Sequence, residues 1–248
     1  RQIVNFIITN RQATHPIVHF HTLFSKKPFV GATMAISSHL TLLTGIAGIN
    51  VYIVRILKLP FDISLHFYFF FFVGVIITGI LKMFFYSSVG AGFLGTLGSS
   101  ALLYVSIHWI ILGNTINIPL LYIQGLLLGF GASMTLVSGS MATLLDGDLK
   151  EAAQRSQTMH TIRNFSAAML IPIIAYTIKN HIQKGTQSIY AENITDKMIY
   201  LKKLQDVAID ADHQIFLLMI IFNMVMFVSS IIQMILGKGR RITPPRES

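Results

Sequence analysis

The stretch SQTMHTIRNFSAAMLIPIIAYTIKNHI, residues 156–182, determines how the rest of this 248-residue chain is interpreted. It is apolar and long enough to span a bilayer, which takes about 20 residues in a helix. Yet Arg163 lies well inside it, with Asn164 beside it and His160 one turn before. Placing a cation near the centre of a bilayer costs roughly 2.5–3.5 kcal/mol of free energy even on the insertion scales that give the lowest values. We therefore expect Arg163 to face the interior of a helix bundle or a watery cavity.

The composition of the chain predicts an integral membrane protein in contact with the lipid bilayer. Hydrophobic residues make up 53% and charged residues 12% of the sequence, and the mean hydropathy is +0.64. Soluble domains carry about 25% charged residues. The formal charge of +9 is attributed to loop topology, so no nucleic-acid partner is expected. The chain opens RQIVNF without an initiator Met, and we expect it to be part of a longer protein.

Six apolar segments predict six transmembrane helices and hence an all-α membrane fold. The expected spans are 29–54, 63–81, 89–112, 118–145, 156–182 and 214–236. Residues 1–28 are expected to form a cytoplasmic or interfacial lead-in, 29–237 the six-helix bundle and 238–248 a basic cytoplasmic tail. The segment 183–213 mixes acidic residues with lysines and is expected to be an external loop. Basic residues gather on the side of the two termini, which the positive-inside rule places in the cytoplasm.

Polar residues within the spans are the candidate site. Asn50 and Gln124 are amides deep in apolar segments, where each needs an interhelical partner or a ligand. His160 and Arg163 are three residues apart and share one helical face. Two interpretations of Arg163 stay open: it lines a cavity that meets substrate, or it joins two helices by bonding to backbone carbonyls. The candidate residues of the translocation pathway are Asn50, Gln124, His160, Arg163 and Asn164.

Acidic residues and histidines in the sequence are candidates for proton coupling and for metal binding. The sequence predicts no carboxylate inside a span, because the acids near the apolar segments fall at their ends or in loops. Residues 15–21, HPIVHFH, place His15, His19 and His21 in a spacing that could suggest a metal box, since histidine is a good ligand for zinc or iron. One such box without an acidic partner is a weak signal. We therefore expect no metal, no cofactor and no enzymatic activity.

Three stretches together resemble the C-terminal half of fourteen-span drug:proton antiporters, the EmrB/QacA type of the major facilitator superfamily. Residues 11–32, RQATHPIVHFHTLFSKKPFVGA, are similar to that family's lead-in, with a His-Pro, a Leu-Phe and a Phe that opens the next span. Residues 122–140, YIQGLLLGFGASMTLVSGS, resemble the span with Ile-Gln-Gly followed by glycines. Residues 146–168, DGDLKEAAQRSQTMHTIRNFSAA, resemble the short cytoplasmic loop and the next span, with Arg163 at the family's Arg position. Ser166, Ala167 and Ala168 depart from the glycines that follow this Arg in the family.

The resemblance implies the six-helix C-terminal bundle of a secondary active transporter in the bacterial cytoplasmic (inner) membrane. The implied activity is proton-coupled efflux of small amphipathic compounds or drugs by alternating access. The implied partners are an N-terminal half that carries the coupling acid, a small-molecule substrate and a periplasmic adaptor protein. Three alternatives stay open: a metabolite or lipid facilitator of the same superfamily, a six-span membrane enzyme with histidine ligands, and a membrane scaffold that transports nothing.

Overall fold

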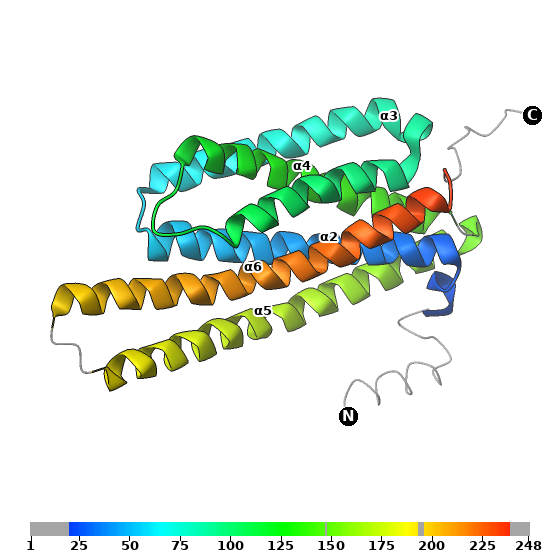
Figure 1. Cartoon of the computed structure of the whole chain (residues 1–248). Helices are drawn as coiled ribbons and strands as arrows, with labels where there is room; N and C mark the ends of the chain where they lie inside the picture. Colours follow the sequence, from blue (N-terminus) through cyan, green and yellow to red (C-terminus); the bar gives the residue numbers. More distant parts are fainter. Residues whose placement is uncertain (1–19, 147, 193–195, 239–248) are drawn as a thin grey trace, which may run out of the picture.

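The computed structural model describes residues 20–146, 148–192 and 196–238, and this part of the chain is helical apart from short connections, without strands (Figure 1). The all-α prediction is therefore confirmed. Three short turns are η1 (Phe20–Leu23), the π-helical η2 (Val51–Ile56) and η3 (Leu149–Glu151). The long helices are α2 (Lys26–Asn50), α3 (Phe61–Trp109), α4 (Ile118–Leu145), α5 (Ala152–Ala191) and α6 (Lys197–Ile235).

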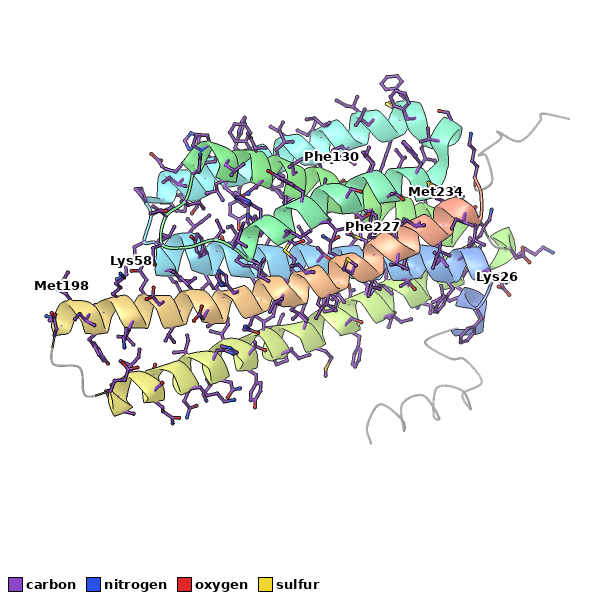
Figure 2. The ribbon with its side chains drawn as sticks, in the orientation of Figure 1. Lys26, Lys58, Phe130, Met198, Phe227 and Met234 are labelled. Atoms are coloured by element: carbon purple, nitrogen blue, oxygen red, sulfur yellow. The ribbon has the colours of Figure 1, made fainter. Side chains whose placement is uncertain are left out.

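Within the described residues, five helices are long and apolar enough to cross a membrane, if α2 is taken together with η2. A bilayer core is about 30 Å thick, which about 20 helical residues span. These helices fit the membrane protein that the composition predicts. Figure 2 identifies two ends of the bundle: Lys58 and Met198 lie toward one end, and Lys26 and Met234 toward the other. We call them the Lys58 end and the Lys26 end.

Helix α3 is bent back on itself at Gly90. Its 49 residues would extend roughly 70 Å in a straight helix at 1.5 Å per residue. Gly90 has φ 82° and ψ 170°, a backbone conformation that glycine adopts without a steric penalty. Figure 1 shows the two arms, residues 61–89 and 91–109, running in opposite directions. The expected break between the second and third apolar segments is therefore a bend at one glycine, with helix on both sides.

Helix α4 packs against both arms of α3 and against α2, and it meets them backbone to backbone. A Cβ atom built on Gly129 would lie 2.0 Å from the carbonyl oxygen of Phe71 in the first arm of α3. A Cβ on Gly139 would lie 2.6 Å from the carbonyl oxygen of Gly31 in α2, and the second arm approaches α4 as closely at Gly98. Small residues allow such close approach between apolar helices. The sequence of α4 therefore specifies its packing through its glycines.

Helices α5 and α6 run antiparallel and extend beyond the other helices at the Lys58 end (Figure 1). The segment 183–213, expected as an external loop, is mostly helical, because α5 continues to Ala191 and α6 already begins at Lys197. Asp196 caps α6, since its side-chain oxygen accepts a hydrogen bond from the backbone N–H of Met198 at 2.8 Å. Residues 197–213 contain neither Gly nor Pro, so nothing in this segment interrupts a helix.

Candidate functional site

Arg155, near the start of α5, joins two helices. Its side chain is 1% exposed. Nε donates to the carbonyl oxygen of Thr143 at 3.0 Å and Nη2 to that of Leu144 at 2.9 Å, while Nη1 lies 3.9 Å from the carboxylate of Glu151. The last carbonyls of a helix have no partner within it, so Arg155 satisfies groups that α4 leaves open at its end. Arg155 thus has the structural role that the sequence left open for Arg163.

Arg163 is placed differently on the same helix. It is partly buried, and its Nε is shielded from solvent without a hydrogen-bond partner in the described part of the chain. It lies within electrostatic range of His39 on α2 and of His160 on its own helix. No ion pair of Arg163 is found among the described residues. The structure thus gathers one arginine and two histidines from α2 and α5, and His39 was not among the expected site residues.

The two amide candidates lie closer to the Lys58 end. Asn50 accepts a hydrogen bond at Oδ1 from the hydroxyl of Tyr68, at 2.8 Å, which links α2 to the first arm of α3. Gln124 is 1% exposed, and its Oε1 accepts from Nε1 of Trp109 at 2.8 Å. Asn50 lies about 16 Å from His39 along α2 at 1.5 Å per residue. The expected site residues therefore form two groups, one of amides and one around Arg163.

Asn164 belongs to neither group. Its side chain is exposed, although Arg163 next to it is partly buried. Asn164 lies four residues after His160 and shares a helical face with it, so it is its exposure that sets it apart from the partly buried His160 and Arg163. No hydrogen bond of the Asn164 side chain is found among the described residues.

A hollow beside Gln124 offers polar groups to a ligand. It has a volume of about 340 Å³ and is lined by His108 near the end of α3 and by residues of the connection between α3 and α4, including Thr115 and Asn117. Gln124 also lines it, and its Nε2 is buried without a hydrogen-bond partner in the described residues. A free amide N–H is a donor only, so the hollow can accept a ligand group that offers an acceptor oxygen or nitrogen.

Two further polar contacts involve residues that the sequence analysis did not select. Lys82, in the first arm of α3, is partly buried and donates from Nζ to the carbonyl oxygen of Ser133 in α4 at 2.7 Å. Gln233 of α6 donates from Nε2 to Oδ2 of Asp146, directly after α4, at 3.0 Å. Both contacts hold α4 against neighbouring helices, so we assign them to the packing of the bundle.

Asp212 is a buried carboxylate that was not among the expected site residues. It lies within α6, one of the five long apolar helices, and its side chain is 1% exposed. The sequence analysis placed it in a solvated loop because charged residues surround it. A periodic signal was present, because Ile209 and Phe216 lie three and four residues away, are also buried, and share one helical face with it.

His15, His19 and the side chain of His21, whose spacing could suggest a metal box, lie outside the described residues. Within the described part, no three His, Asp or Glu side chains gather in a way that could hold a metal ion. No protein-family model matches the sequence, and no curated protein matches it either. The resemblance to the drug:proton antiporters therefore stays a prediction.

Proposed function

We propose that the chain is the C-terminal bundle of a secondary active transporter of the major facilitator type. The two arms of α3 each cross the membrane in this proposal, which gives six spans with both termini in the cytoplasm. The transporter exports small amphipathic compounds or drugs across the bacterial cytoplasmic membrane by alternating access. The observation that carries the proposal is Arg163, a cation in an apolar helix for which the described residues supply no counter-ion.

The coverage of α5 supports a partner on its open side. Only 6% of the most apolar stretch of α5 is buried, against 50% for α2 and for α4. Lipid covers an apolar face well but disfavours a cation, which faces a bundle interior or a water-filled cavity. A second bundle opposite α5 and α2 would enclose such a cavity around Arg163, His39 and His160. Two bundles about a midplane site are the arrangement that alternating access requires.

The test measures efflux by the complete product of the gene that encodes this chain. Cells that produce it are loaded with a fluorescent amphipathic cation, and dye retention is compared with cells that carry the empty vector. We expect the wild type to retain less dye and to lose this advantage when a protonophore removes the proton gradient. Retention equal to the empty vector for a panel of amphipathic dyes would contradict the proposal. Efflux that survives the protonophore would favour the facilitator alternative.

Variants of Arg163 tie the activity to this site. Arg163→Ala should lower efflux at least tenfold per folded molecule, because the cavity loses its cation. Arg163→Lys should restore part of it, since an ammonium supplies the charge but not the planar set of five donors. Lys179→Ala on the exposed side of the same helix is the matched control and should leave efflux unchanged. Equal efflux by wild type and Arg163→Ala would remove Arg163 from the site.

A further inference from the structure

Asp212 lies where three elements meet at the Lys58 end of the bundle. The hydroxyl of Tyr52 in η2 donates to the carbonyl oxygen of Gly113, in the connection between α3 and α4. His213 of α6 donates from Nε2 to the carbonyl oxygen of Leu112 at 2.8 Å. These contacts hold η2, the 110–117 connection and α6 together, and we call their meeting point the junction. Asp212 is buried at this junction, yet it takes part in none of its hydrogen bonds.

Both carboxylate oxygens of Asp212 are buried without a hydrogen-bond partner in the described residues. This is unusual, because buried polar groups are nearly always hydrogen-bonded. An ionised carboxylate without a partner is among the costliest groups to bury, and its neutral acid is far cheaper. The surroundings of Asp212 therefore decide which of the two forms the site accommodates.

In the described part of the chain, no cation forms an ion pair with Asp212. From η2, Tyr52 is the titratable side chain within electrostatic range of it, and the 110–117 connection contains no charged residue. On α6, His213 is committed to the carbonyl of Leu112, and Asp210 is exposed. Gly185 packs against Val207, so the antiparallel helix α5 brings its residues 179–181 to the height of Asp212. Neither Lys179 nor His181 forms a hydrogen bond or ion pair with the carboxylate.

We propose that Asp212 is a proton-binding site, at which the buried carboxylate takes up a proton from solvent at the Lys58 end and returns it there. Binding forms one O–H bond on the carboxyl group, and release leaves a carboxylate that draws water into the junction. The protonated form of Asp212 therefore favours the arrangement in which η2, the 110–117 connection and α6 are packed together without water between them. The proposal concerns this bundle alone and holds whether or not the chain transports a substrate.

The only tryptophan of the chain is a built-in reporter for this junction. The ring of Trp109 lies 5.4 Å from that of Phe216, centroid to centroid. Phe216 is four residues after Asp212 and thus one turn further on the same face of α6. Water that enters the junction on deprotonation should change the surroundings, and hence the fluorescence, of Trp109.

The first experiment detects the proton directly by infrared difference spectroscopy on the purified full chain in lipid nanodiscs. Between about pH 6 and pH 9 exposed carboxyl groups are already ionised, so a carboxylic-acid C=O band lost over this range reports a buried acid. We expect this band in the wild type and in Asp210→Asn, whose altered residue is exposed. It should be absent in Asp212→Asn. A wild type without the band overturns the proposal, whatever the variants do.

The second experiment follows Trp109 fluorescence over the same pH range and separates Asp212 from its neighbouring histidine. We expect a single step at the pH of the infrared change, absent in Asp212→Asn and retained in His213→Gln. Asp212→Glu keeps a carboxyl group and should keep the step at a shifted pH, which shows that loss in the Asn variant is not caused by misfolding. A step that survives in Asp212→Asn but vanishes in His213→Gln would assign the proton to the histidine and overturn the proposal.

Discussion

Helices α4 and α5 lie in the same bundle but differ in what specifies their positions. Half of the most apolar stretch of α4 is buried, against 6% of that of α5. Helix α4 contacts its neighbours through glycines along its length, whereas α5 has one glycine, Gly185, near its far end. The position of α4 is thus fixed by this chain alone. Most of the apolar surface of α5 is left uncovered by this chain, so its position also depends on what packs against it from outside.

The largest expected effect concerns the centre of α4. Gly129→Leu places side-chain atoms where the carbonyl oxygen of Phe71 lies, and the backbone of α3 cannot move aside cheaply. We expect destabilisation of about 3 kcal/mol and little monodisperse protein in fluorescence-detected size-exclusion chromatography. Gly79→Leu is the control, because a Cβ atom at Gly79 meets nothing within 4 Å. Equal yields of the two variants would contradict the close approach of α4 and α3.

The second largest effect is expected at Arg155, which joins α5 to the end of α4. Arg155→Ala leaves the carbonyls of Thr143 and Leu144 without their charged donor, and hydrogen bonds to charged groups each contribute about 1.5–3 kcal/mol. We expect a clear fall in the thermal unfolding midpoint. Arg155→Lys should recover part of it, because one ammonium cannot reach two carbonyls with the geometry of a guanidinium. A midpoint equal to that of the wild type would show that α4 and α5 are held by other contacts.

The smallest effect on stability is expected at Arg163, on the open part of α5. Arg163→Ala removes no hydrogen bond or ion pair found in the described residues, so the unfolding free energy should change by no more than about 0.5 kcal/mol. Thermal unfolding of Arg163→Ala and Arg155→Ala side by side tests the contrast directly. A larger loss at Arg163 than at Arg155 would reverse the roles assigned to the two arginines.

Sequence predicts the fold class well because helix length and apolar content are local properties. The expected span 118–145 coincides with α4, since Asn117 caps its start and Pro119 suits its first turn. The bend at Gly90 was not predicted, and the segment 183–213 is more fully helical than the external loop that was expected. Charge content indicated a loop in 183–213, but a helix that extends beyond the membrane tolerates charges equally well.

The candidate site was predicted less completely, because burial and partners are tertiary properties. Arg163 was selected because it interrupts an apolar stretch, and that signal is local. Arg155 lies just before the stretch, and only the end of α4 folded against it reveals its role. Asp212 was hidden among other charged residues. His39 lies on a different helix from Arg163, so its place beside Arg163 cannot be deduced from spacing along one helix.

The glycine contacts of α4 also determine how this bundle can move. Where backbone rests on backbone, no flexible side chain lies between two helices to absorb a displacement, and packed cores switch between arrangements rather than deform continuously. Helices α2, α3 and α4 should therefore turn as one rigid body. Flexibility is left to the ends of α5 and α6 that extend past the bundle, so a hinge or a lever arm in this protein would be built from those two helices.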